Sequence, residues 1–256
     1  MKNDVQSQRD ERQIAIDKVG VKNIKYPIVV EDRKHKFQHT IADIDIFVDL
    51  PHEHRGTHMS RFIEVLNSYH KENLIDSLEF LLSDVKSQLN SQKAYIKIRF
   101  PYFIEKAAPV SKITSLLDYE CVFEAYLSDV YKFELGVTVP ITTLCPCSKE
   151  ISDYGAHNQR SYVTVKIRYN QFVWIEELID IVENKASCEI YPLLKRSDEK
   201  YVTERAFDNP AFVEDIVRDV TLALKADKRI DWFCVESENM ESIHNHNAYA
   251  RVEFGV

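Results

Sequence analysis

The stretch HTIADIDIFVDL, residues 39–50, alternates apolar and polar side chains along most of its length. A period of two is typical of a β-strand with one buried face. Two helical patterns follow at residues 59–69 and 74–89, and strand patterns return at residues 94–100 and 119–126. The first part of the chain therefore predicts a strand, two helices and further strands.

The same order of elements returns in the second part of the chain. Strands, then helices, then strands are predicted at residues 131–143, 162–169, 174–184, 210–225, 230–236 and 248–254. Pro210 stands near the first turn of the second helix, where a proline is tolerated, and Asp208 or Asn209 is its expected cap. We expect an α+β fold whose halves pack as one unit, because no low-complexity linker separates them.

Three segments are expected along the chain. Residues 1–36 are polar and rich in charge, which predicts a flexible or peripheral arm. Residues 37–125 hold the first set of strands and helices, and residues 126–256 hold the second set with the candidate metal site. The doubling is inferred from the order of elements, since no repeat is visible at the level of residues.

Composition limits the class of protein. The 256 residues are 45% hydrophobic and 29% charged, as in an ordinary soluble globular protein. No apolar run approaches the roughly 20 residues of a membrane helix, and residues 1–10 lack the apolar core of a signal peptide. Five cysteines without a framework spacing predict a reducing cytoplasm. The net charge of −8 argues against a broad nucleic-acid surface, so an anionic substrate needs a local basic pocket.

Thiols and an imidazole come together in LCPCSKE, residues 144–150, and GAHNQR, residues 155–160. Cys145 and Cys147 flank a proline, which predicts an extended segment with both thiols on one face. Thiolate and imidazole are preferred Zn²⁺ ligands, so Cys145 or Cys147 with His157 leaves positions for a carboxylate and a water. This pattern favours a catalytic metal. The alternative is a pair of buried cysteines at a strand end.

Two other segments concentrate basic side chains. His244 and His246 flank one asparagine, and an extended chain would point both imidazoles to one face for metal binding, proton transfer or phosphate contact. Residues 50–62 hold three histidines with Arg55 and Arg61 at a strand-to-helix junction, which favours anion binding at a helix N-terminus. A solvated loop is the alternative for both segments.

Two carboxylates complete the set of candidates. Glu199 lies in KRSDEK, residues 195–200, which looks like a solvated turn. Glu214 lies in the amphipathic pattern of residues 210–225. A glutamate buried there needs a partner, and the adjacent N–H donors of a guanine edge match a bidentate carboxylate. The alternative is an exposed helical glutamate.

Together these segments resemble GTP cyclohydrolase type IB, the metal-dependent enzyme that opens the pterin branch of folate synthesis. The resemblance covers most of the chain from about residue 38 and rests on five segments: residues 144–160, 52–62, 195–199, 209–218 and 244–246. It implies a tunnelling fold with two ββααββ-like halves of antiparallel sheet in each subunit. It also implies a homotetramer with active sites at the subunit interfaces.

The resemblance implies a metal site. Cys145, His157 and Glu199 would hold a divalent ion, Zn, Mn or Fe, with water completing the coordination. Cys145 is preferred over Cys147 because of its spacing of twelve residues from His157. The type of ion stays open, since a mixed sulfur, nitrogen and oxygen site accepts several.

The resemblance also implies a substrate site for GTP. Glu214 would anchor the guanine edge, and His244 and His246 would act as catalytic or metal-proximal imidazoles beside Cys145. Candidates for the triphosphate are the basic residues of the same segments: Arg55, His58, Arg61, Lys149 and Arg160.

The implied reaction is a hydrolytic opening of the guanine imidazole ring. Metal-bound water attacks C8, an imidazole protonates the departing ring nitrogen, and a second hydrolysis releases formate and leads to 7,8-dihydroneopterin triphosphate. The product would serve tetrahydrofolate synthesis, queuosine synthesis or both.

Two rival functions stand beside this one. A nitrile reductase of the queuosine branch shares the tunnelling fold and uses a nucleophilic cysteine and a nicotinamide without a metal, so His157 and Glu199 argue against it. A non-catalytic zinc-stabilised binding protein would complete the metal shell with a fourth protein ligand.

Overall fold

The computed structural model describes residue 6 and residues 8–69 and 74–255. Contacts divide the chain into two compact units. The first unit holds the residues up to Pro101 with Val122–Glu134, and the second holds Tyr102–Cys121 with the residues from Leu135 onward. Two strands, β3 (Ala94–Ala107) and β4 (Thr114–Leu127), contribute residues to both units. The boundary expected after residue 125 stays a prediction.

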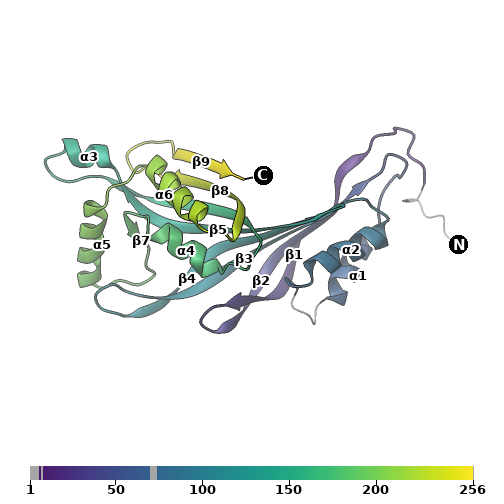
Figure 1. Ribbon diagram of the computed structural model, residues 1–256, viewed down its shortest axis with the longest axis horizontal. Coiled ribbons are helices and arrows are strands. Elements are labelled where there is room, and N and C mark those ends of the chain that lie inside the picture. Colours follow the sequence, from purple (N-terminus) through teal and green to yellow (C-terminus); the bar gives the residue numbers. More distant parts are fainter. Residues whose placement is uncertain (1–5, 7, 70–73, 256) are drawn as a thin grey trace. The chain divides into compact units, whose positions relative to one another are not determined.

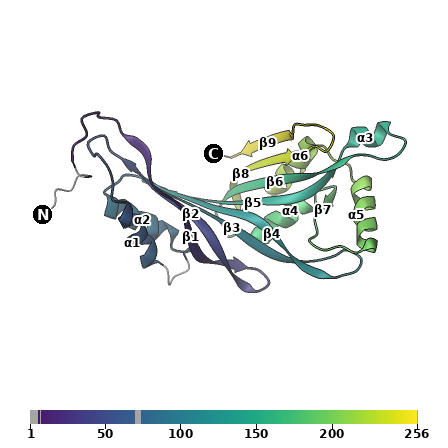
Figure 2. The same cartoon turned by 180° about the vertical axis from the view of Figure 1, so that it is seen from behind.

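The first unit is built on a long antiparallel hairpin of β1 (Ile16–Asp32) and β2 (Lys36–Leu50). β3 pairs antiparallel with β2, and β4 follows in the hydrogen-bonded order. Helices α1 (Met59–Ser68) and α2 (Leu78–Leu89) contact each other and the hairpin strands (Figure 2). The predicted order of strand, two helices and strands is confirmed in this unit.

Strand β1 occupies residues 16–32, where a polar arm was expected, and for these residues that expectation is wrong. All of its first twelve side chains are exposed or half-buried, so their polarity is compatible with a strand. The hairpin strands approach closely at Gly20, where an added Cβ would lie 2.0 Å from the carbonyl oxygen of Ile46. A residue without a side chain is therefore required at that position.

The alternation predicted for residues 39–50 is confirmed by burial. Ala42, Ile44, Ile46 and Val48 are at most 1% exposed, and they lie on one face of β2 because their spacing is two. These side chains form part of the hydrophobic core of this unit.

The second unit contains an antiparallel set of strands. β4 is followed in the hydrogen-bonded order by four strands: β5 (Tyr131–Leu144), β6 (Asn158–Tyr169), β8 (Ile230–Asn239) and β9 (Ala248–Phe254). A strand of two residues, β7 (Cys188–Glu189), pairs with β5 at Ile141 and Thr142 (Figure 1). The α+β class and the antiparallel pairing are both confirmed.

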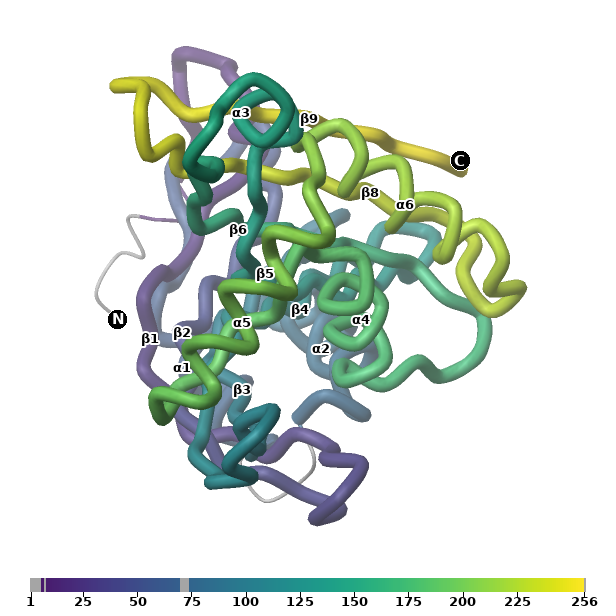
Figure 3. The backbone as a smooth tube through the Cα atoms, turned by 90° about the vertical axis from the view of Figure 1, so that its left-hand side faces the viewer, coloured from purple at the N-terminus to yellow at the C-terminus, as the bar shows by residue number. Residues whose placement is uncertain are grey.

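Four helices belong to the second unit: α3 (Pro146–Ile151), α4 (Ile175–Glu183), α5 (Arg196–Asp208) and α6 (Val213–Ala226). α6 packs on β8 and β9 and against α4 (Figure 3). α3 and α5 are additions to the two predicted helices. No helix in the described part of the chain is long and apolar enough to cross a membrane.

Both additional helices correct the sequence analysis. α5 begins at Arg196, within the segment expected to be a solvated turn. α3 begins at Pro146, so the proline occupies the first helical position, where its missing N–H costs no hydrogen bond. The prediction of an extended conformation is confirmed for Cys145, with φ −69° and ψ 117°, but Cys147 is helical and that part of the prediction is wrong.

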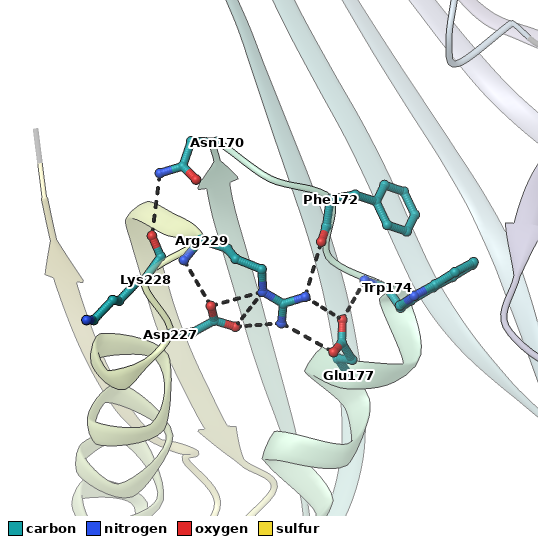
Figure 4. Close-up of polar contacts among 7 residues, drawn as sticks. All are labelled: Asn170, Phe172, Trp174, Glu177, Asp227, Lys228 and Arg229. Atoms are coloured by element: carbon teal, nitrogen blue, oxygen red, sulfur yellow. Dashed lines mark hydrogen bonds and ion pairs between the residues drawn. The ribbon is translucent and has the colours of Figure 1, made fainter.

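A network around Arg229 fixes the loop between β6 and α4 (Figure 4). Its guanidinium donates to the carboxylates of Asp227, at 2.7 Å, and Glu177, at 3.2 Å, and to the carbonyl oxygen of Phe172, at 3.2 Å. Hydrogen bonding from Arg229 lowers the pKa of Asp227 despite its partial burial, and the same bonds raise the pKa of Arg229. The Glu177 carboxylate also accepts the N–H of Trp174 and so caps α4.

Candidate active site

Cys145 and His157 lie side by side where β5 ends and β6 begins. The N–H of Cys145 donates to the carbonyl oxygen of His157 at 3.1 Å. Ser148 closes the turn between them: its N–H donates to the Cys145 sulfur at 3.4 Å, and its hydroxyl accepts the N–H of His157 at 3.2 Å. The backbone thus brings together the two residues that the sequence analysis paired as metal ligands.

The imidazole of His157 is half-buried and has two distinct nitrogens. Nδ1 lies 3.1 Å from Oε1 of Gln159 and 3.5 Å from the hydroxyl of Ser242. Among the described residues, Nε2 has no hydrogen-bond partner. A metal-binding histidine has one nitrogen held by the protein and the other directed to the ion, so Nε2 is the candidate ligand atom.

Burial separates the five thiols into two groups. Cys121, Cys188 and Cys234 are buried, and burial raises the pKa of each. A buried neutral thiol is inert, because the thiolate is the form that binds metals. Cys145 is half-buried and Cys147 is exposed, so only these two are accessible to a ligand. The alternative of two buried cysteines at a strand end is therefore wrong.

Glu199 lies in the first turn of α5 and is exposed. Val202 and Ala206 follow it at i+3 and i+7, so the three share one helix face. Both apolar residues belong to a small cluster with Leu144 and Ala156, the neighbours in sequence of Cys145 and His157. α5 therefore packs beside the two other candidate ligands through Val202 and Ala206, and Glu199 is exposed one turn before Val202.

No three histidine, cysteine, aspartate or glutamate side chains converge on a possible metal position in the part of the chain that the structure describes. Cys145 and His157 are adjacent, and Glu199 lies on the neighbouring helix. Thiolate, imidazole and carboxylate are nevertheless the donor types that Zn²⁺ and related ions accept together. By their chemistry these residues fit a divalent metal.

Asp198, next to Glu199, is a residue that the sequence analysis missed. Its buried carboxylate accepts the N–H groups of Val110, Ser111 and Lys195, each at 2.8 Å, and the Ser111 hydroxyl at 2.6 Å. Burial raises the pKa of Asp198, but these hydrogen bonds outweigh it and hold the pKa well below its usual range. They tie the start of α5 to the turn between β3 and β4.

The loop between β8 and β9 carries His244 and His246 to this end of the unit. Its first residue, Met240, donates its N–H to the carbonyl oxygen of Arg160 at 2.9 Å, and Ser242 lies against His157. The two imidazole rings are exposed and stack with centroids 5.0 Å apart. The loop that contacts His157 through Ser242 thus carries two exposed, stacked imidazoles.

The remaining candidates of the second unit differ in their surroundings. Glu214 is exposed in the first turn of α6, as in the alternative of an exposed helical glutamate. The ammonium of Lys149 donates to the carbonyl oxygen of Phe207 at the end of α5. Arg160 lines a cleft of about 640 Å³ whose walls include four carboxylates: Asp118, Glu120, Glu236 and Glu238.

Arg55, His58 and Arg61 lie in the first unit, at the junction of β2 and α1. Arg55 is exposed and donates to the side chain of Gln8 at 3.2 Å. His58 precedes the first residue of α1, and Arg61 donates to the carbonyl oxygen of Gln88 at 2.7 Å. The predicted helix start near Met59 is confirmed, so these basic side chains lie at the N-terminus of α1.

Comparison with known proteins identifies the family. The model of the type I GTP cyclohydrolase folE2 family matches residues 2–250. The chain belongs to this family. GTP cyclohydrolase FolE2 of Geobacter sp. (strain M21) is 58% identical over 250 residues, covering 98% of this chain and 94% of the relative. The same enzyme of Nitrosococcus oceani is 55% identical over 251 residues, covering 98% and 94%.

The family match settles the activity. The chain is a GTP cyclohydrolase of folate biosynthesis, with GTP as its substrate. The rival assignments as a nitrile reductase or a non-catalytic zinc-stabilised protein are therefore wrong.

Solved structures support the expected fold. The uricase of Arthrobacter globiformis superposes with a TM-score of 0.54 at 8% identity, covering 94% of this chain and 93% of that one. A hyperthermostable variant of the Bacillus sp. TB-90 urate oxidase gives a TM-score of 0.55 at 11% identity, covering 94% and 100%. The cyclohydrolase thus shares the tunnelling fold of the urate oxidases.

Proposed function

We propose that this cyclohydrolase opens the imidazole ring of GTP at a metal site formed by Cys145, His157 and Glu199, and releases formate and 7,8-dihydroneopterin triphosphate. The observation that carries the site assignment is the pairing of Cys145 with His157 across the turn between β5 and β6. All five cysteines of the protein are unpaired, which suits a reducing compartment such as the cytoplasm.

Each proposed ligand contributes a donor of a different type. Cys145 supplies sulfur, His157 supplies Nε2, and Glu199 supplies a carboxylate from the first turn of α5, the helix that packs beside them. A divalent metal bound there would act as a Lewis acid and lower the pKa of a coordinated water. Zn, Mn and Fe ions all accept these three donor types, so the proposal specifies a divalent metal ion and leaves the element open.

Residues other than the three proposed metal ligands hold the substrate and supply the proton for the ring opening. Glu214 accepts the adjacent N–H donors of the guanine edge, and its exposure at the start of α6 leaves both oxygens accessible. His244 or His246 protonates the departing ring nitrogen, a role that suits an imidazole near neutral pH. The triphosphate contacts are assigned to the basic residues named above: Arg55, His58, Arg61, Lys149 and Arg160.

We further propose that the active site is completed by a neighbouring subunit in a homotetramer. The strand face that carries Arg160 also carries four carboxylates and exposed apolar side chains, including Tyr162 and Tyr249, which are 40% and 57% exposed. A triphosphate beside those carboxylates would be repelled, and exposed apolar patches are typical of interfaces. Both observations support an additional chain that covers the face and adds positive charge.

The test is a single assay with defined metals. The purified chain is incubated with GTP and Mn²⁺ or Zn²⁺, with and without a chelator, while formate release and the pterin absorbance are followed. We expect both products with metal and neither with chelator. Absence of turnover with every divalent metal tried would overturn the metal site. A tetramer is expected by light scattering under the same conditions, and an active monomer would contradict the shared site.

A further inference from the structure

A chain of buried polar side chains runs from the sheet to His157. Nε2 of Gln159 donates to the hydroxyl of Thr143 at 2.9 Å, and that hydroxyl lies 2.7 Å from the hydroxyl of Ser161. Gln159 is 7% exposed, and Thr143 and Ser161 are fully buried. Burying three polar groups is costly unless they are hydrogen-bonded. The chain satisfies them and ends on Nδ1 of His157.

The two ends of the Gln159 amide are chemically different. The oxygen can only accept a hydrogen bond, and the nitrogen can only donate one. With the oxygen toward His157, Nδ1 must carry the proton, and Nε2 keeps a lone pair. With the amide turned over, Nδ1 would accept and Nε2 would carry the proton in the neutral ring. Only the first arrangement, which is the one observed, leaves Nε2 able to bind a metal.

We propose that Gln159 is a positioning residue that holds His157 in the Nδ1–H tautomer and directs Nε2 to the metal. The inference rests on the proposed function, since it requires His157 to be a ligand. Thr143 accepts the N–H of Gln159, and either hydroxyl of the Thr143–Ser161 pair can donate the bond between them.

The test compares the zinc affinity of full-length variants by competition with a chromophoric chelator. Gln159→Leu removes the acceptor at Nδ1 and is expected to weaken zinc binding roughly 10–100-fold, the usual effect of losing such a partner. Gln159→Glu keeps an acceptor at the same place, and the Thr143 hydroxyl can rotate to donate to it. We expect this variant to stay within a few-fold of the native affinity.

Ser242→Ala is the matched control. Ser242 also lies at Nδ1, but at 3.5 Å and on an exposed loop, so its loss is expected to leave the affinity almost unchanged. A purely structural role for Gln159 would instead weaken the leucine and glutamate variants alike, because leucine loses the hydrogen bond to Thr143 and glutamate buries a charge at the same position. That result would overturn the proposal.

A second measurement keeps the proposal testable if a variant folds poorly. Long-range ¹H–¹⁵N correlation reports which imidazole nitrogen of His157 is protonated, and we expect Nδ1 in the native zinc-loaded protein. A proton on Nε2 would overturn the inference. Failure of the proposed function is recognised separately: His157→Ala would then retain zinc. If His157→Ala loses zinc while Gln159→Leu binds it normally, only the inference about Gln159 is wrong.

Discussion

Two turns of the second unit are equally rich in polar side chains but use them differently. In the loop between β6 and α4, the guanidinium of Arg229 is surrounded by Asp227, Glu177 and a carbonyl oxygen (Figure 4). In the turn between β5 and β6, the sulfur of Cys145 accepts one N–H, and the imidazole of His157 is held at Nδ1 alone.

The difference shows how structural and functional polar clusters can be separated. Around Arg229 the opposite charges neutralise one another, and the result is a fixed loop. Around Cys145 and His157 the hydrogen bonds orient each side chain, but they leave a lone pair on sulfur and another on Nε2. Oriented donors with remaining capacity are what a metal site requires. Substitutions at the two sites should therefore differ in what they change: metal content and turnover at Cys145, and stability at Arg229.

Replacing Cys145 by alanine should remove the metal and reduce turnover on the order of 10³-fold or more, because a bound metal lowers the pKa of its water from 15.7 to about 7. Metal content and formate release measure the two effects. Cys147→Ala is the matched control, since this exposed thiol lies two residues away and should be dispensable for most of the metal. Equal behaviour of the two variants would show that the choice of Cys145 is wrong.

Replacing Glu214 by glutamine should weaken GTP binding while leaving the metal in place. A hydrogen bond to a charged group contributes about 1.5–3 kcal/mol, which corresponds to roughly 10–150-fold in KM. Asp219→Asn removes a charge from an exposed position of the same helix and should change KM little. Loss of metal in the Glu214 variant would instead place this carboxylate among the metal ligands, and it would contradict its assignment to guanine binding alone.

Replacing Arg229 by glutamine should act on stability alone. The variant loses several charge-assisted hydrogen bonds at a partly exposed site, so we expect the free energy of unfolding to fall by about 1–3 kcal/mol in urea titrations. Arg218→Gln is the control, because its ion pair with Asp215 is long and largely exposed. If the folded Arg229 variant lost its metal, the two turns would be coupled and the comparison would not hold.

The helices and strands that can be predicted from the sequence are those in which one buried face leaves a regular pattern. The alternation in β2 and the apolar stripe of α2 are predicted correctly, since burial of one face leaves a direct period in the sequence. β1 is missed because its first half is largely exposed and has no such period. α5 is missed because only Asp198 and Ala206 of its thirteen residues are buried.

The site is predictable only in part for a similar reason. Cys145 and His157 are recognisable by residue type and short spacing, and the turn that joins them is local. Asp198 is not recognisable, because its partners Val110 and Ser111 stand 88 and 87 residues earlier in the chain. The Arg229 network is not recognisable in the sequence for the same reason, since Glu177 lies 52 residues from Arg229. Contacts of this range depend on the fold and leave no local pattern.

The smallest predicted effect is a pH dependence of the Arg229 network. Arg229 lowers the pKa of Asp227 in the folded protein. A carboxylate with a lowered pKa contributes stability above its unfolded pKa of about 3.9, and this contribution is lost as the pH falls through the folded pKa. The stability difference between the native protein and Arg229→Gln should therefore be complete at neutral pH and shrink below about pH 4.

The stability difference between the native protein and Arg229→Gln should decrease by about 1 kcal/mol or less at low pH, because the pair of Arg229 and Asp227 is partly exposed. Urea titrations of both proteins at several pH values measure it, and Asp227→Asn serves as the control because its amide does not titrate. A difference that stays constant down to pH 3 would mean that Arg229 stabilises the loop through packing and its bond to the Phe172 carbonyl. The β6–α4 loop would then be fixed by shape, and ion pairing would no longer be what separates it from the turn that holds Cys145 and His157.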